Sequence, residues 1–475
     1  MDFSLVLQSP SFSARSEAPV ILPDNRGWTW DTGEGREIRV EFSQSMPSVD
    51  FERRGNTKHI RALMVGSELA KGLHTFDMSI TLPEGAALVP SASERYGPAE
   101  TSSWHANALS ADASPVDLSF LNHTPAGAKG FVRAEGDALV FEDGTPARFW
   151  GGNLAAYALF RPKEEVDAHA RRIAQLGYNL MRIHHHDSMA WVKPTVIDQG
   201  RDDSQHLAPE AMDRLDYLIK SLKEQGVYVW LDLHVGRLFK EGDVQSLLGT
   251  IGGFEEIARR KGEIKGFCYF NETVQALMVD FNAKYLNHVN PYTGLAYKDD
   301  PAVMGVLVTN ENDLTHHFGN LMLPDKKNPI HNAMFQKAVN AFCSDTGLPP
   351  GETWKTWVPG PSKIFLNQQE YEFGAAMQGN LRELGLRVPI ATTNFWGNMA
   401  AYSLPSLALG GIVDAHSYGG AEAFQANPRY APNYLSWIAA AQVHGKPVSI
   451  SEWNVPYPGM DRFTAPLYMA GAASL

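Results

Sequence analysis

Two glutamates in the second half of the chain stand where apolar runs end. Glu311 follows residues 303–308 and two polar residues, and Glu452 follows residues 448–450 and one serine. Hydrolysis of a glycosidic bond needs such a pair, because one carboxyl group protonates the leaving oxygen while the other acts from the opposite side of the sugar carbon. One glutamate alone would be as consistent with a solvated loop or an ion pair as with catalysis. Two of them, in Asn-Glu and Ser-Glu-Trp contexts, favour catalysis.

Polar and aromatic residues at the ends of these and other apolar runs complete a candidate binding site. Their side chains can hold a carboxylate or a sugar hydroxyl, and an indole ring suits the C–H face of a pyranose. The predicted substrate-binding residues are Arg182, His184, His234, Asn310, Trp396, His416, Tyr418 and Trp453. Arg182 could instead be a structural ion pair, and any one tryptophan is more often core than platform. Among the tryptophans, Trp396 is the preferred platform.

The elements that must position these residues alternate between strand and helix patterns. Apolar faces after Pro162 and over residues 209–224 predict helices that end at glycines. Apolar runs predict seven strands, at residues 149–152, 180–183, 227–233, 303–308, 389–392, 412–415 and 448–450. Repeated strand-helix-strand units indicate an α/β fold with parallel strands, and the commonest enzyme fold of this kind is the (β/α)8 TIM barrel. In that barrel the active site lies at the carboxyl ends of the strands.

The strand count is one short of a closed barrel. Only 21 residues follow Asn454, which is enough for one helix and no further strand. We therefore expect a barrel whose eighth strand is missing from this chain, open at that edge and marginally stable. A helix over residues 463–473 would then lack the surface on which Leu467 and Met469 pack.

The first part of the chain has a different pattern. Short β-prone stretches at residues 37–42, 60–65, 75–82 and 116–121 are separated by turn-forming residues, which predicts a small sandwich-like all-β domain. Proline, glycine and alanine over residues 122–130 predict a linker. We therefore expect an accessory domain at residues 1–128 and an incomplete barrel at residues 129–475.

The amino-acid composition and net charge limit the classes of partner that the protein could bind. The chain has 475 residues, 44% of them hydrophobic and 20% charged, as in ordinary globular proteins. The net charge of −12 argues against nucleic acid and anionic lipid and favours a neutral partner such as a carbohydrate.

No run of 18 apolar residues predicts a membrane span, and residues 3–7 are too short for a secretory signal. The protein is expected to be extracellular or periplasmic if a signal peptide is missing from this chain, and otherwise cytoplasmic. Cys268 and Cys343 are too few for a disulfide scaffold.

The ordered set of strand-end residues resembles clan A glycoside hydrolases, in particular the cellulase-like family five. The resemblance rests on Arg182, His234, Asn310-Glu311, His416-x-Tyr418 and Glu452, and it covers about residues 129–475. Residues 149–153, 182–188 and 290–294 are also similar to a poorly characterised bacterial branch in which a β domain precedes the barrel.

This resemblance implies a retaining double displacement on a β-linked oligo- or polysaccharide without a cofactor. It implies that Glu452 is the nucleophile and that Glu311 is the general acid and then the base. It further implies that Asn310 binds the sugar 2-hydroxyl, Arg182 and Tyr418 hold the nucleophile, and His234 and His416 line the subsite. We expect the two carboxyl groups at the retaining separation, about 5 to 5.5 Å.

Two other functions stay open. His184 and His186 form a His-x-His pair at a strand end that, with His234, His416 and an aspartate, could bind zinc as metal-dependent amidohydrolases do. That class usually carries the pair on its first strand, so loop histidines that bond sugar or backbone are the preferred interpretation. The chain could also be a carbohydrate-binding protein without turnover. Activity measurements distinguish the three functions. A glycosidase is insensitive to chelators, a metal-dependent amidohydrolase loses activity with them, and a binding protein turns nothing over.

Overall fold

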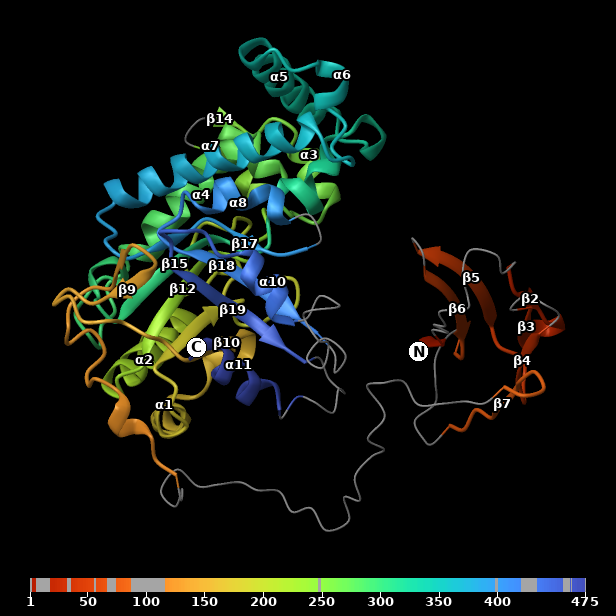
Figure 1. The fold of residues 1–475 in the computed structure, drawn as a ribbon, viewed down its shortest axis with the longest axis horizontal. Helices are drawn as coiled ribbons and strands as arrows, with labels where there is room; N and C mark the ends of the chain where they lie inside the picture. The colour runs from red at the N-terminus through yellow and green to blue at the C-terminus, as the bar shows by residue number, and fades with distance from the viewer. Residues whose placement is uncertain are drawn as a thin grey trace. The chain divides into compact units, whose positions relative to one another are not determined.

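The fold is available as a computed structural model. It describes residues 2–5, 18–31, 36–54, 57–65, 74–86, 116–246, 249–397, 400–419, 434–455, 462 and 464–474. The chain divides into two compact units, Met1–Ser91 and Ala92–Leu475, whereas we expected the division near residue 128 (Figure 1). The two units are described separately below.

The first unit contains two antiparallel sheets. One has the strand order β1 (Asp2–Leu5), β6 (Thr57–Leu63), β5 (Ser48–Arg54), and the other has the order β2 (Val20–Ile21), β3 (Gly27–Asp31), β4 (Glu37–Phe42), β7 (Met78–Thr81). Alternate residues of the strands point to one side, as strand geometry requires, and both sheets contribute to one buried cluster that includes Trp28, Trp30 and Ile60. The strands predicted within residues 37–82 are therefore confirmed.

The segment 116–128 differs from the prediction. Residues 116–121 were predicted to be a strand, but Ser119–Leu121 form a 3-10 turn, because the Asp117 carboxylate accepts bonds from both the backbone and the hydroxyl of Ser119. Asn122 then donates to the Tyr178 carbonyl at 3.1 Å, so this segment is part of the second unit rather than of the predicted accessory domain.

The second unit is built on parallel strands. A five-stranded sheet has the order β10 (Gly151–Ala155), β11 (Leu180–His184), β12 (Tyr228–His234), β15 (Val303–Thr309), β16 (Ile390–Ala391), and a three-stranded sheet has the order β17 (Asn394–Phe395), β18 (Val413–Tyr418), β19 (Val448–Asn454). Every residue of β12 and β15 is buried, which explains their nearly continuous apolar sequences. The predicted α/β fold with parallel strands is confirmed, and each predicted apolar run lies in or beside a strand. Short antiparallel pairs, β8 (Arg133–Glu135) with β9 (Ala138–Val140) and β13 (Gln245–Ser246) with β14 (Gly249–Thr250), lie outside these sheets.

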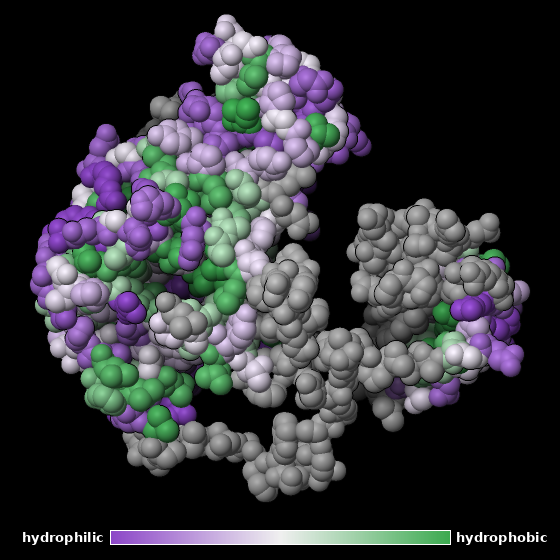
Figure 2. Space-filling model, in the orientation of Figure 1, coloured by the Kyte–Doolittle hydropathy of each residue, from purple (hydrophilic) through white to green (hydrophobic). Residues whose placement is uncertain are grey.

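Helices lie between the parallel strands and after the last of them. They are α1 (Lys163–Gln175), α2 (Pro209–Glu224), α3 (Phe254–Arg259), α4 (Glu272–Leu286), α5 (Pro329–Thr346), α6 (Pro350–Thr353), α7 (Pro361–Glu383), α8 (Leu404–Leu407), α10 (Tyr434–Ala440) and α11 (Ala465–Ala473). Figure 1 shows α1 and α2 on one side of the strands and α4, α7 and α8 on the other. Figure 2 shows hydrophilic and hydrophobic residues interspersed over one face of this unit. None of the helices in the described ranges is both long and apolar enough to cross a membrane.

The described residues after β19 contain α11 and no further strand. The helix has nearly the predicted bounds, but its packing differs from the prediction. Met469 is buried in a cluster with Trp150, Ile450 and Trp453, beside β10 and β19, whereas Leu467 is 78% exposed. One of the two residues expected to lack a packing surface therefore has one.

Candidate active site

Arg182 lies at the centre of the candidate site, at the carboxyl ends of the parallel strands. Its Nη1 donates to Glu452 Oε1 at 2.8 Å, and its Nη2 donates to Asn310 Oδ1 at 2.7 Å. Its Nε lies 3.0 Å from both carboxylate oxygens of Asp232. The guanidinium is 3% exposed, so its charge is balanced by the two carboxylates rather than by water. It thus joins β11, β12, β15 and β19.

Asp232 on β12 was not among the predicted site residues. It is fully buried and accepts a bond from His184 Nδ1 at 2.6 Å as well as those from Arg182. The other nitrogen of His184, Nε2, lies 3.1 Å from Glu452 Oε1. A carboxylate inside an otherwise apolar strand is the signal that could have revealed Asp232, because such a group needs a buried cationic partner.

Glu452 is surrounded by donors. Tyr418 donates its hydroxyl to Glu452 Oε2 at 2.7 Å, while Arg182 and His184 bind Oε1. Burial by itself raises the pKa of Glu452, but the hydrogen bond from His184 and the positive charges of His416 and Arg182 outweigh it and hold the pKa far below its usual range. Burial and the bond to Glu452 raise the pKa of Tyr418, so its hydroxyl keeps its proton. The site therefore favours an ionised Glu452.

Glu311 has a different environment. Its side chain is 23% exposed, against 10% for Glu452. Its backbone has a φ of +46°, a left-handed conformation that is costly for a residue with a side chain, and its N–H donates to Asn394 Oδ1 at 2.7 Å. Oε1 lies 2.8 Å from His416 Nδ1. Asn394, which the sequence analysis did not select, thus fixes the backbone that presents this carboxyl group.

A buried polar chain lies behind His416. Its Nε2 is 3.1 Å from Ser451 Oγ and 3.5 Å from Glu452 Oε1. Ser451 in turn donates to Asp414, which also accepts a bond from Asn394 Nδ2 at 2.6 Å. Asp414 is fully buried, so the groups around it are held in one arrangement.

One carboxylate oxygen of Glu311, one of Glu452 and a ring nitrogen of His416 all lie within 4.8 Å of one another. This is the only group of three metal-binding side chains found among the described residues. An ion placed there would compete with Arg182 and His184, which already bind Glu452. Such an arrangement of two close carboxyl groups can protonate a leaving oxygen and attack the adjacent carbon.

Among the described residues, His184 and His186 do not form the zinc site that the sequence left open as an alternative. Both ring nitrogens of His184 already contact carboxylates, of Asp232 and Glu452. The ring of His186 is buried and stacks on Tyr285 at a centroid distance of 5.1 Å. In the described part of the chain, the one group of side chains close enough to hold a metal ion is Glu311, His416 and Glu452. Neither His184 nor His186 belongs to it.

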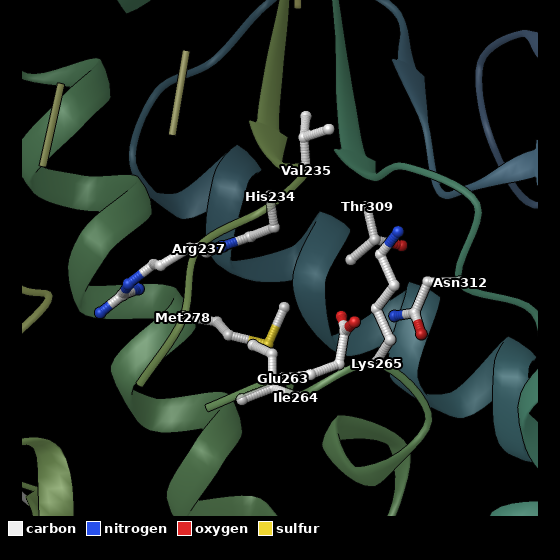
Figure 3. A pocket seen from close by; sticks show the side chains of 9 residues that line it. All are labelled: His234, Val235, Arg237, Glu263, Ile264, Lys265, Met278, Thr309 and Asn312. Carbon is white, nitrogen blue, oxygen red and sulfur yellow. The ribbon is translucent and has the colours of Figure 1, made fainter. Parts of the chain in front are cut away.

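His234 was predicted to line the subsite, but its ring lies elsewhere. It packs on Phe281 of α4 at a centroid distance of 5.4 Å and lines a small pocket with Arg237, Thr309 and Asn312 (Figure 3). Burial, followed by the charge of Arg237, lowers the pKa of His234 to about 3, so the ring is neutral. His184, which was predicted only as a substrate-binding residue, contacts Glu452 instead, with its Nε2 at 3.1 Å from Oε1.

The two predicted tryptophans lie in different surroundings. Trp396 stacks on His317 with centroids 3.6 Å apart and planes 12° apart, so one face of its indole is already covered. Asp313 holds His317 by accepting from its backbone N–H and contacting its Nδ1. Trp453 packs on Trp150 at 5.8 Å in the apolar cluster of α11, which makes it a packing residue.

Among known proteins, similarity to this chain was found only in solved structures. No family model and no curated protein matches the chain. An endo-1,4-β-mannanase from Rhizomucor miehei is 16% identical over 73% of this chain and 88% of its own, with a TM-score of 0.46. An endo-β-1,4-mannanase from Thermotoga petrophila is 16% identical over 66% of this chain, with a TM-score of 0.38, and this chain spans 62% of its length. A glycoside hydrolase family 5 structure from Bacteroides vulgatus is 13% identical over 70% of this chain and 55% of its own, with a TM-score of 0.37.

The solved structures to which this chain is similar include mannanases and a member of glycoside hydrolase family 5.

Proposed function

We propose that this protein is a retaining glycoside hydrolase that acts on a β-linked oligo- or polysaccharide. In this proposal Glu452 is the nucleophile and Glu311 is the general acid and then the base. The observation that carries the proposal is the pair of carboxyl groups, with one oxygen of each no farther than 4.8 Å from the other. Glu452 accepts bonds from several donors, whereas Glu311 is more exposed. The distance between the two oxygens supports the retaining separation of about 5 to 5.5 Å rather than the wider gap of inverting enzymes.

In the first step, Glu452 attacks the anomeric carbon and a covalent glycosyl-enzyme forms. Arg182, His184 and Tyr418 support this role because their donors keep the carboxylate ionised and oriented. The bond to the leaving oxygen breaks as Glu311 gives that oxygen a proton. In the second step Glu311 takes a proton from water, the water attacks the anomeric carbon, and Glu452 leaves.

Asn310 suits the binding of a sugar hydroxyl. Its Oδ1 accepts a bond from Arg182, which leaves the amide N–H groups to donate toward a substrate. A hydroxyl next to the anomeric carbon would lie between Asn310 and Glu452, the two groups that Arg182 joins.

We also propose that the parallel strands form the wall of a (β/α)8-type barrel, with the two-sheet N-terminal unit as an accessory domain. Arg182 on β11 reaches both Asn310 after β15 and Glu452 on β19, so strands of the two sheets converge on one guanidinium. A curved wall brings such strands together, whereas a flat sheet separates them.

The test uses E452Q and E311Q on a panel of β-linked glucans, mannans and oligosaccharides. Each change keeps the shape of the side chain and removes the acid or nucleophile, so kcat should fall by about a hundredfold or more. The control is E372Q, which changes an exposed glutamate on α7. NMR of the first product formed by the unchanged protein should show retained anomeric configuration. Inverted configuration, or near-normal kcat in either site variant, would contradict the proposal.

A further inference from the structure

A second pocket lies at the opposite ends of the strands from the candidate active site. Its lining includes Pro389 and Pro447, which directly precede β16 and β19, and a cavity of about 330 Å³ opens between them. Since the catalytic carboxyl groups lie at the carboxyl ends of these strands, the proposed reaction does not use this pocket.

Four cationic side chains line this pocket: Arg133, Arg382, Arg387 and Lys446. No carboxylate lines it, although the whole chain has a net charge of −12. None of the four forms an ion pair within the described part of the chain. Lys223, by contrast, binds Asp300 at 2.7 Å and Arg161 binds Glu165 at 2.7 Å. Four like charges around one cavity repel one another unless an anion joins them.

Three of these cations are held in place by groups that do not neutralise them. Arg382 Nη1 donates to the carbonyls of Leu386 at 2.7 Å and Val388 at 2.9 Å. Lys446 Nζ donates to the Gly410 carbonyl at 3.0 Å. The guanidinium carbon of Arg387 lies 3.6 Å from the centroid of the Phe131 ring. A ligand would therefore meet side chains whose freedom is already reduced, which lowers the entropic cost of binding.

Burial lowers the pKa of Arg382, and no acidic neighbour opposes that shift. By contrast, Asp232 and Glu452 raise the pKa of Arg182 against its burial. Arg382 thus carries a charge that no carboxylate pairs with among the described residues, in agreement with the absence of carboxylates from the lining.

We propose that this pocket binds a small, multiply charged oxyanion of the phosphate or sulfate class. Three of its four cations are arginines, whose planar donor pairs match the oxygens of such anions. The cavity volume is at the lower end of the range of small-molecule sites, which suits a compact ligand such as a pyrophosphate or a phosphorylated sugar.

Isothermal titration of the full chain with inorganic pyrophosphate tests the proposal, at an ionic strength held constant with sodium chloride. We expect saturable binding with one site per chain. K446Q and R382Q each remove one charge at the pocket, and each should weaken binding by about tenfold. The control K355Q removes an exposed lysine that pairs with Glu352 on α6 and should leave binding unchanged. R133Q provides a second test at an exposed arginine whose bond to the Glu142 carbonyl is long, at 3.4 Å.

Hydrolysis separates this proposal from the proposed function, because R133Q and K446Q should keep the kcat of the unchanged protein. Absence of saturable heat, or equal affinity in all the variants, would overturn the anion site. Citrate carries comparable charge without tetrahedral oxygens, so citrate binding as tight as that of pyrophosphate would overturn the assigned class. Competition of sulfate with pyrophosphate would support it.

Discussion

At the scale of single residues, the site depends on how buried charges are balanced. Arg182 and His184 both lie between Asp232 and Glu452, so each carboxylate has two nitrogen partners. Burial by itself lowers the pKa of His184, but its bonds to Asp232 and Glu452 outweigh burial and raise that pKa. A cationic His184 then lowers the pKa of Glu452 further.

This coupling predicts the pH profile of H184Q. The substitution removes a hydrogen bond and a positive charge from Glu452, so the pKa of Glu452 should rise. An ionised nucleophile would then persist only at higher pH, and the acidic limb of kcat/KM should move upward. The control is H206Q. His206 is exposed and pairs with Asp203, so it contacts neither Asp232 nor Glu452. An unchanged acidic limb in H184Q would show that His184 does not act through Glu452.

Asp232 gives a prediction about stability. D232N leaves the buried Arg182 with one carboxylate in place of two, and breaking a buried pair costs about 3–5 kcal/mol of the free energy of unfolding. E165Q is the matched control, since it breaks the exposed pair with Arg161 and should cost less than about 1 kcal/mol. Denaturant titration of both variants measures the difference. Equal losses would mean that burial does not strengthen the Asp232 pair.

At the scale of elements, a π-helical turn (Leu314–Phe318) follows the Asn-Glu pair and carries His317 to Trp396. Glu370 of α7 anchors this turn by accepting from the N–H groups of Leu314 at 2.6 Å and Thr315 at 3.2 Å. Gly397 faces it closely, because a Cβ there would lie 2.5 Å from both His316 and His317. Packing from two distant segments therefore shapes this part of the site.

Burial, with the nearby charge of Asp313, raises the pKa of Glu370 to about 7. Between its unfolded pKa of about 4.5 and about 7, the folded protein binds this proton more tightly than the unfolded chain. The stability contributed by this proton is complete below about 4.5 and is lost as the pH rises through 7. E370Q keeps the acceptor oxygen but does not titrate, so its melting temperature should fall less between pH 5 and pH 8. An equal fall in both proteins would contradict this assignment.

At the scale of the whole molecule, chelation distinguishes the proposed hydrolase from the metal-dependent alternative. The mechanism above uses only side chains, and Arg182 and His184 occupy the Glu452 oxygen nearest to His416. Dialysis against EDTA should therefore leave kcat unchanged on the best substrate of the panel. The control is a known zinc hydrolase treated in the same way. Loss of activity that zinc restores would support a metal at Glu311, His416 and Glu452.

Much of this architecture could be predicted from the sequence alone. The bounds of α2 and β4 match their predicted ranges, and the apolar runs predicted the parallel strands. These features are local, because periodicity and end signals report which side of an element is buried. The same runs indicated Glu311, Glu452, Arg182 and Asn310, since polar residues at or just after the carboxyl ends of buried strands lie at one edge of a parallel sheet.

The partners of these residues were decided by the tertiary structure. Arg182 and Glu452 are 270 positions apart, and no local pattern could indicate that His184 rather than His234 would contact Glu452. His184 and His234 both follow apolar strands, but the ring of His234 packs on Phe281 of a later helix. Asn394 and Asp414 were missed for the same reason, because their roles depend on side chains from other strands. Sequence determines which residues reach the strand ends, whereas the packing of distant segments determines which of them meet.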